Sequence, residues 1–90
     1  TGAEVIVHGK VWDEANQRAK ELSQDADTEY VPAFDHPVLW EGHSTLVDEV
    51  LEVCPQVDVM VTSVGGAGLL AGILTGLMRH GRTDCRIIAC

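Results

Sequence analysis

The sequence predicts an α/β fold in which a parallel sheet is flanked by helices. Three features indicate this fold: strand-like and helix-like segments alternate, the connections between them are short, and a glycine-rich turn leads from a strand into a helix. Strands that follow one another through helical crossovers pair in parallel, and the helices then cover the sheet.

The first third of the chain is predicted to hold one strand and one helix. Residues 3–7, Ala-Glu-Val-Ile-Val, are rich in strand formers and end at a His-Gly pair, which indicates a short strand. Over residues 11–22, apolar side chains recur at steps of three and four, the spacing of one helix face. Glu14 and Arg18 have the spacing of a supporting ion pair. The polar residues 23–29 should end this helix.

A second helix is predicted from about Pro37 to residue 53. Residues 30–31 are a candidate for a brief strand before it. Asp35 is expected to cap the helix, because its carboxylate can accept a hydrogen bond from a free N–H and Pro37 needs no partner in the first turn. The helix either runs unbroken or restarts after Gly42. Its buried stripe is expected to consist of Leu46, Val47, Val50, Leu51 and Cys54.

The last third is predicted to form a strand, a helix and a strand around a glycine-rich turn. The strands are expected over residues 57–62 and 86–90, and the helix from residue 67 or 68 to residue 80, with Gly81 as its C-cap. The turn, SVGGAGLL at residues 63–70, follows the end of a strand and opens a helix. Both positions favour an anionic ligand, so a phosphate group is the natural occupant.

Two common phosphate-binding motifs do not fit this turn. A P-loop needs a lysine within a Gly-Lys-Ser/Thr sequence, and no lysine follows Lys20. The dinucleotide fingerprint is matched only in its permissive form, by Gly66, Gly68 and Ala71, and the acidic residue expected about twenty residues later is not found. The turn therefore does not match a P-loop and fits a dinucleotide-binding motif only weakly, so a different phosphate-containing ligand is expected.

Composition argues against several other classes of function. The formal charge of −8, from six basic and fourteen acidic residues, argues against a nucleic-acid partner. Residues 65–78 form the longest strongly apolar stretch, which is too short and too rich in glycine to span a membrane. The four histidines lack metal-binding spacing, so no metal site is expected. Reduced thiols are expected at the three cysteines, Cys54, Cys85 and Cys90, which contain no Cys-x-x-Cys pair.

Four short motifs, taken together, are typical of one enzyme family. They are GAEV at residues 2–5, VWDEA at 11–15, PAFDHP at 32–37 with WEGH at 40–43, and SVGGAGLLAG at 63–72. With these motifs the chain resembles the pyridoxal-phosphate-dependent serine and threonine dehydratases, which have the tryptophan synthase β-subunit type of fold. The Gly-His pair at residues 42–43 looks closest to the animal-type L-serine dehydratases.

The resemblance implies an incomplete part of a larger enzyme. That enzyme would have two domains of fold type II, and these 90 residues would be its middle. Residues 1–33 would be the C-terminal part of the small domain, and residues 34–90 would be part of the large, cofactor-binding domain. We expect the full-length enzyme to be a homodimer in the cytoplasm, with no nucleic-acid or membrane partner.

The resemblance also implies pyridoxal 5'-phosphate as the cofactor. Its phosphate would be held by the backbone N–H groups of Gly65, Gly66, Ala67, Gly68 and Leu69. Ala67 stands where the family normally has a glycine, and we expect a negative φ there because the rest of the loop keeps the pattern. His43 would lie near the cofactor pocket in a structural role.

The implied activity is a deaminating β-elimination that turns L-serine or L-threonine into a 2-oxo acid and ammonia. Phe34 is the candidate substrate-binding residue, with an ordinary core aromatic as the alternative. Lys10 and Lys20 are expected on the surface, so no catalytic residue is assigned and the chain should be inactive alone. Two alternative functions stay open: a serine racemase of the same fold, and a non-catalytic module that binds a phosphate or a partner.

Overall fold

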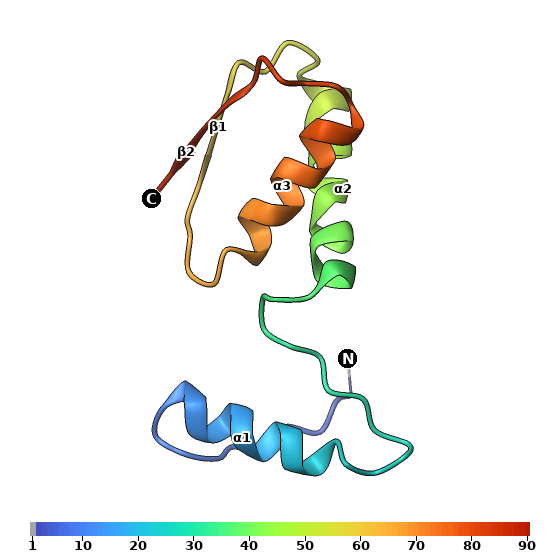
Figure 1. Cartoon of the computed structure of the whole chain (residues 1–90), viewed down its shortest axis with the longest axis vertical. Coiled ribbons are helices and arrows are strands. Elements are labelled where there is room, and N and C mark those ends of the chain that lie inside the picture. The colour runs from blue at the N-terminus through green and yellow to red at the C-terminus, as the bar shows by residue number, and fades with distance from the viewer. Residues whose placement is uncertain (1) are drawn as a thin grey trace. The chain divides into compact units, whose positions relative to one another are not determined.

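The computed structural model describes residues 2–90, which form two compact units (Figure 1). The first unit extends to Val31 and contains α1 (Trp12–Leu22). The second unit, Pro32–Cys90, contains α2 (Pro37–Val53), β1 (Val59–Thr62), α3 (Gly68–Arg79) and β2 (Arg86–Ala89). Within residues 2–90, no helix combines the length and apolar character that crossing a membrane requires.

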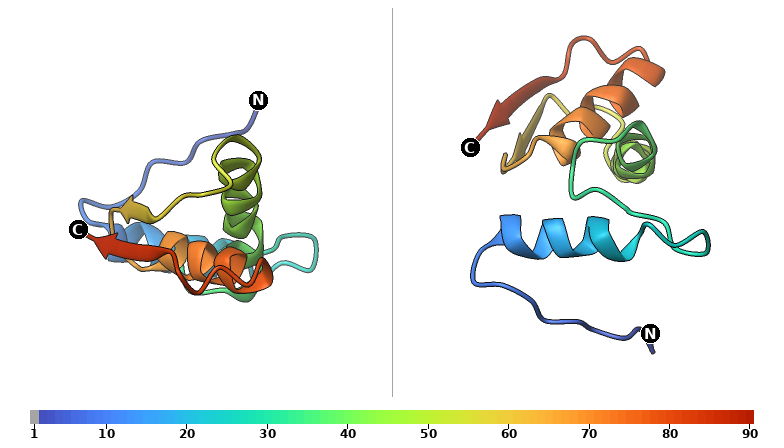
Figure 2. Two further views of the ribbon diagram at one scale, coloured as in Figure 1. Left: turned by 90° about the horizontal axis from the view of Figure 1, so that it is seen from above. Right: turned by 60° about the horizontal axis from the view of Figure 1, so that its bottom comes forward.

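The first unit contains the predicted helix but not the predicted strands. Residues 3–7 run as an extended segment before α1 without forming a strand (Figure 2), and residues 30–31 form none either. Val5 and Val7 are 81% and 90% exposed. The prediction of a strand at residues 3–7 is therefore wrong for this structure, because a β-prone segment becomes a strand only when a neighbouring strand supplies its hydrogen bonds.

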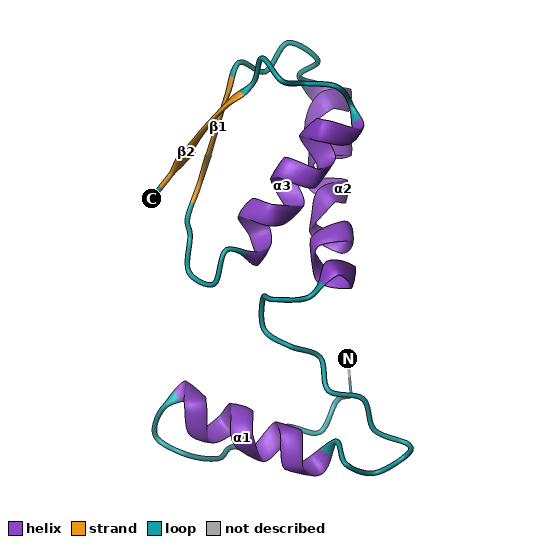
Figure 3. Ribbon diagram, viewed as in Figure 1, coloured by secondary structure: helices purple, strands orange, loops and turns teal. Residues whose placement is uncertain are grey.

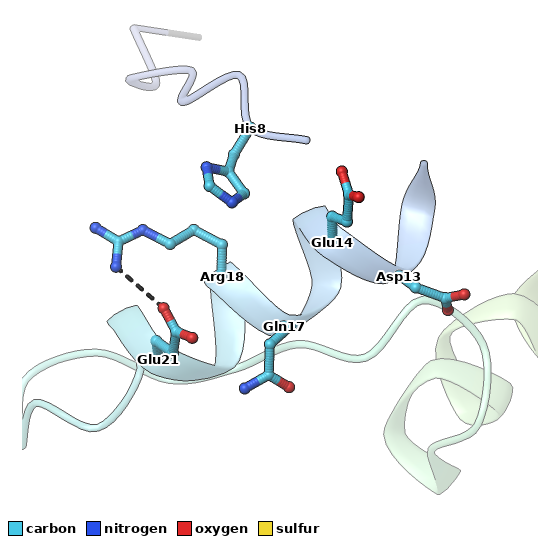
Figure 4. A pocket seen from close by; sticks show the side chains of 6 residues that line it. All are labelled: His8, Asp13, Glu14, Gln17, Arg18 and Glu21. Atoms are coloured by element: carbon cyan, nitrogen blue, oxygen red, sulfur yellow. Dashed lines mark hydrogen bonds and ion pairs between the residues drawn. The ribbon is translucent and has the colours of Figure 1, made fainter. Parts of the chain in front are cut away.

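The ion pair on α1 differs from the predicted one. Arg18 pairs with Glu21 at 3.2 Å (Figure 4), whereas Glu14 accepts a hydrogen bond from the backbone N–H of Lys10 at 2.7 Å. The prediction that Glu14 pairs with Arg18 is thus wrong. Glu14 lies in the first turn, where the free N–H of Lys10 offers its carboxylate a closer donor, and the exposed Arg18–Glu21 pair adds little stability.

The second unit contains the predicted strand, helix and strand (Figure 3). β1 and β2 pair in parallel, with Val59 opposite Arg86 and Thr62 opposite Ala89, and α3 forms the crossover between them. Residues from three elements form the buried core, Val47, Met60, Ile73 and Leu77. The prediction of a parallel sheet flanked by helices is confirmed.

Helix α2 is unbroken, which settles the alternative of a restart after Gly42. Its cap is His36, whose Nδ1 accepts a hydrogen bond from the N–H of Val38 at 3.2 Å, so the prediction of Asp35 as the cap is wrong by one residue. Pro37 occupies the first turn, as predicted.

The predicted buried stripe of α2 is only partly buried. Val47 is fully buried, and Val50 and Leu51 pack against the core. Two members are exposed, Leu46 and Cys54, the latter because the helix ends at Val53.

Helices α2 and α3 approach closely because α3 presents glycines to α2. A Cβ atom built on Gly72 would lie 2.3 Å from Cβ of His43 and 2.9 Å from the carbonyl oxygen of Trp40. A Cβ atom on Gly76 would lie 2.7 Å from the carbonyl oxygen of Ser44. Side chains at these two positions would force the helices apart, so glycine is required there for space.

Arg79 joins the end of α3 to α2 through several hydrogen bonds. Its guanidinium group donates to Glu41 at 2.9 Å, to Oγ of the buried Ser44 at 3.0 Å and to both carboxylate oxygens of Asp48 at 2.9 and 3.0 Å. His80 is also hydrogen-bonded to Asp48. Both contacts with Asp48 come from Nη2 of Arg79, and hydrogen bonds between charged groups are stronger than neutral ones, so this network strengthens the contact between the two helices.

Because of the Asp48 carboxylate, the free energy of unfolding should change with pH in the acidic range. Hydrogen bonds with His80 and Arg79 lower the pKa of Asp48 below its ordinary value of 3.8. A carboxylate whose pKa is lower in the folded state than in the unfolded state stabilises the fold at pH values above its unfolded-state pKa. This stabilisation is lost as the pH falls through its folded-state pKa. Asp48→Asn should therefore lower the urea midpoint at pH 7, and the difference from wild type should shrink below about pH 4.

A matched variant distinguishes the loss of the hydrogen bonds made by Asp48 from the general effect of removing one negative charge. Glu49 is an exposed acid on the same helix, so Glu49→Gln should leave the urea midpoint nearly unchanged at both pH values. An Asp48→Asn difference that is as large at pH 3 as at pH 7 would contradict the role given to the ionised carboxylate.

The turn after α3 anchors the start of β1. The C-cap of α3 is His80, so the prediction of Gly81 as the cap is wrong by one residue. Gly81 follows the cap with φ of 66°, the left-handed conformation that a glycine often adopts just beyond a helix end. Arg82 then donates to the carbonyl oxygens of Pro55 at 2.6 Å and Val57 at 2.7 Å. These bonds hold the segment that leads into β1, and β1 in turn carries the glycine-rich loop.

Candidate anion-binding site

The glycine-rich loop lies where the sequence places it, between the end of β1 and the start of α3. The parallel ladder continues past β2: the N–H of Cys90 donates to Thr62 at 3.0 Å, and the N–H of Val64 donates to Cys90 at 2.8 Å. The first residues of the loop are thereby fixed to the sheet. The residues that follow turn away from the sheet and enter α3 at Gly68.

The loop presents a run of unpaired backbone donors. Among the described residues, no protein acceptor is found for the N–H groups of residues 65–70, and the first bond of the helix is from Ala71 to the carbonyl of Ala67 at 2.9 Å. The N-terminus of α3 also carries the partial positive charge of the helix dipole. Several N–H groups and a positive dipole end together suit a phosphate or carboxylate group.

Ala67 adopts a left-handed conformation, so the prediction of a negative φ is wrong. Its φ is 66° and its ψ is 4°. Within residues 2–90, the other positive φ angles belong to glycines outside the loop, Gly2, Gly9 and Gly81. The three loop glycines therefore do not supply the left-handed residue, and the alanine adopts it at a steric cost of about 1–2 kcal/mol.

Replacing Ala67 with glycine should stabilise the protein. The substitution removes about 1–2 kcal/mol of strain, while the more flexible unfolded chain offsets about 0.4–1 kcal/mol of that gain. We expect a net gain of up to about 1.5 kcal/mol, measured as a rise in the urea midpoint.

Ala71→Gly is the matched control, because Ala71 lies inside α3 with an ordinary helical backbone. That change should destabilise the protein by about 1 kcal/mol. Equal losses in the two variants would show that Ala67 carries no strain.

Two loop glycines make room for Phe34. A Cβ atom on Gly66 would lie 2.1 Å from Cγ of the Phe34 ring, and one on Gly68 would lie 2.8 Å from the Phe34 carbonyl oxygen. The indole N–H of Trp40 donates to the same carbonyl at 2.9 Å. Phe34, which is 38% exposed, is therefore held against the loop by contacts on two sides. The Trp40 bond was not predicted, since it depends on how the chain turns before α2.

A pocket of about 270 Å³ lies beside the loop. It brings together all six residues that the sequence analysis selected, Phe34, Gly65, Gly66, Ala67, Gly68 and Leu69. Ala33, His43 and Ser63 complete its lining. No acidic residue lines it, although the chain has fourteen. An anion would meet backbone N–H groups here and no carboxylate.

A second pocket, in the first unit, has a different character (Figure 4). It lies over one face of α1 and has a volume of about 350 Å³. Three acids line it together with His8, Gln17 and Arg18, and Arg18 is already paired with Glu21. Three acidic side chains against one arginine give this pocket a negative balance of charge, which disfavours an anionic ligand.

The whole chain, residues 1–90, matches the family model described as pyridoxal-phosphate dependent enzyme. The chain belongs to this family. The family resemblance predicted from the four motifs is thereby confirmed, and with it the α/β class of the fold. Members depend on a cofactor with a phosphate group, the kind of ligand that the loop suits.

Relatives within the pyridoxal-phosphate family share about half of the sequence. The chain is 51% identical over 94 residues to an L-serine dehydratase from Dictyostelium discoideum, which covers 97% of this chain and 27% of the relative. It is 52% identical over 91 residues to a human serine dehydratase-like protein, covering 98% of this chain and 27% of the relative. The chain thus spans about a quarter of the length of these relatives.

A solved structure agrees with the same family assignment. The crystal structure of a fungal L-serine ammonia-lyase from Rhizomucor miehei matches with a TM-score of 0.85 and 35% sequence identity. The match covers 93% of this chain and 27% of that one. The arrangement described here is therefore that of a segment of a pyridoxal-phosphate enzyme.

The residues beside the loop fit the cofactor of the family. The unpaired N–H groups of residues 65–70 can satisfy the oxygens of a phosphate group. A Cβ atom on Gly65 would meet nothing within 4 Å, so a ligand can come close to the backbone there. A dianionic group would also meet no acidic side chain in the lining of the pocket.

Proposed function

We propose that this chain is part of a pyridoxal-phosphate-dependent L-serine/L-threonine dehydratase and contributes its phosphate-binding loop. The reaction is a deaminating β-elimination that yields a 2-oxo acid and ammonia. One observation carries the proposal: a loop with unpaired N–H groups at the end of β1, in a chain 51% identical to an L-serine dehydratase. The similarity to an L-serine ammonia-lyase supports the same reaction.

The residues of the loop bind and orient the cofactor in this proposal. The backbone N–H groups of Gly65, Gly66, Ala67, Gly68 and Leu69 hold its phosphate. When bound, pyridoxal phosphate supplies an electron sink that eases loss of the substrate Cα proton and of the β-hydroxyl group. Phe34 packs on the loop next to this position, so its ring contacts the substrate and helps to exclude water.

The two units correspond to the two domains of the proposed enzyme. Residues 1–33 belong to its small domain and residues 34–90 to its large, cofactor-binding domain. The chain separates into units between Val31 and Pro32, two residues before the proposed domain boundary, which supports this assignment. We further propose a cytoplasmic homodimer, on the resemblance to animal-type serine dehydratases, which sedimentation of the full-length protein at its native concentration tests.

The proposed activity is tested on the purified full-length protein. With pyridoxal phosphate and L-serine it should release pyruvate and ammonia in equal amounts, and with L-threonine 2-oxobutyrate and ammonia. Removal of the cofactor by dialysis against hydroxylamine should abolish both activities, and its return should restore them. Formation of D-serine without pyruvate would contradict the proposal in favour of a racemase. Failure to bind the cofactor would contradict it in favour of a non-catalytic module.

A further inference from the structure

His43 lies on α2 and lines the same pocket as the glycine-rich loop. The lining of this pocket offers two side chains with polar groups, His43 and Ser63. His43 is the one side chain in the lining that can carry a positive charge. A residue that can donate a hydrogen bond and carry a positive charge therefore lines the same pocket as the anion-binding loop.

The ring of His43 is available to a ligand. Among the described residues, neither of its ring nitrogens has a hydrogen-bond partner within the protein. In contrast, His36, which precedes α2, uses its Nδ1 to cap that helix, and His80 is paired with Asp48. His43 thus keeps its hydrogen-bonding capacity unused at the edge of the pocket.

The backbone of His43 is held firmly against α3. A Cβ atom built on Gly72 would lie 2.3 Å from Cβ of His43 and 3.0 Å from its carbonyl carbon. Gly72 is one turn beyond Gly68, the first residue of α3. The contact fixes His43 next to the first turns of α3, and the loop residues with free N–H groups line the same pocket as His43. A donor placed there needs little ordering when a ligand binds.

We propose that His43 donates a hydrogen bond to the phosphate of the bound cofactor and so completes, from α2, the set of donors that the loop provides. This inference rests on the proposed function. It makes His43 a cofactor-binding residue and replaces the structural role expected from the sequence. A hydrogen bond to a charged group contributes more than one between neutral groups, so its loss should lower affinity for the cofactor about tenfold or more.

The test compares cofactor affinity in three forms of the full-length apoprotein: wild type, His43→Leu and His43→Gln. Leucine has a similar size but no donor, whereas glutamine keeps an N–H group at similar reach. Each form is titrated with pyridoxal 5'-phosphate and with pyridoxal, which lacks the phosphate, and binding is followed by absorbance. Circular dichroism confirms that the variants are folded.

The proposal expects His43→Leu to weaken binding of pyridoxal phosphate about tenfold or more, with little effect on pyridoxal, and His43→Gln to restore most of the loss. Equal weakening of both ligands, or no rescue by glutamine, would overturn it in favour of a structural role. Unchanged affinity in His43→Leu would also overturn it. A wild-type protein that shows no preference for pyridoxal phosphate over pyridoxal would instead contradict the proposed function of the loop.

Discussion

Replacing Gly72 with alanine is expected to destabilise the full-length protein by about 2 kcal/mol. Overpacking a close-packed core costs about 1–3 kcal/mol. We expect the upper end because the new methyl group would meet Cβ of His43 at 2.3 Å and the backbone carbonyl oxygen of Trp40 at 2.9 Å, and neither is the far end of a flexible side chain. Alanine returns about 1 kcal/mol as the better helix former. The difference is measured as a lowered midpoint in urea unfolding.

Gly42→Ala is the matched control for this prediction. Gly42 also lies inside a helix, α2, but a Cβ atom there would meet nothing within 4 Å. This substitution should therefore stabilise the protein by about 0.5–1 kcal/mol through helix propensity alone. Opposite signs for the two variants support close helix contact at Gly72. A stabilising Gly72→Ala would contradict it.

The opposite effects on stability expected for alanine at Gly72 and at Gly42 show what a sequence pattern can and cannot predict. Helical periodicity predicted α2 and α3 to within about two residues, because the apolar spacing reflects burial along one face. Whether a particular glycine is needed for space depends on which element packs against it. The distance between Gly72 and His43 comes from the crossing of α2 and α3, a contact that Arg79 and Asp48 strengthen.

The candidate site was predicted in its location and only partly in its conformation. The place of the loop follows from a strand, a glycine-rich turn and a helix in succession, which local patterns indicate. The φ of Ala67 was predicted wrongly because the number of glycines in a loop does not say which residue is left-handed. Gly66 and Gly68 give space to Phe34 instead, and only the packing of Phe34 reveals that use.

Residues 3–7 show that composition alone does not predict whether a segment forms a strand. Their composition favours a strand, yet Val5, Ile6 and Val7 are exposed and no strand pairs with them within residues 2–90. Strand formation depends on a partner that supplies hydrogen bonds, so it is less local than helix formation. The cap of α2 shows a related limit, because the side chains of Asp35 and His36 can both accept a hydrogen bond and the sequence does not say which one does; in the structure it is His36.

Replacing Gly66 with alanine is expected to weaken binding of pyridoxal phosphate by about tenfold or more in the full-length apoprotein. The new methyl group would lie 2.1 Å from Cγ and 2.2 Å from Cδ1 of the Phe34 ring. These atoms lie near the base of the ring, so either the ring or the loop backbone must move. If the loop moves to make room, the bound phosphate must restore its original position against an overpacking cost of about 1–3 kcal/mol. Each ~1.4 kcal/mol of that cost corresponds to a tenfold change in affinity.

A double-mutant cycle with Phe34→Ala isolates the cause of this effect. Once the ring is removed, the methyl group at residue 66 no longer meets it, so Gly66→Ala should cost little further affinity in that background. Contacting residues in such cycles show coupling of about 0.5–3 kcal/mol. Equal losses in the presence and absence of the ring would show that glycine at residue 66 serves the ligand directly and not the packing of Phe34. The cycle therefore distinguishes a loop shaped by Phe34 from a loop shaped only by the phosphate that it is proposed to hold.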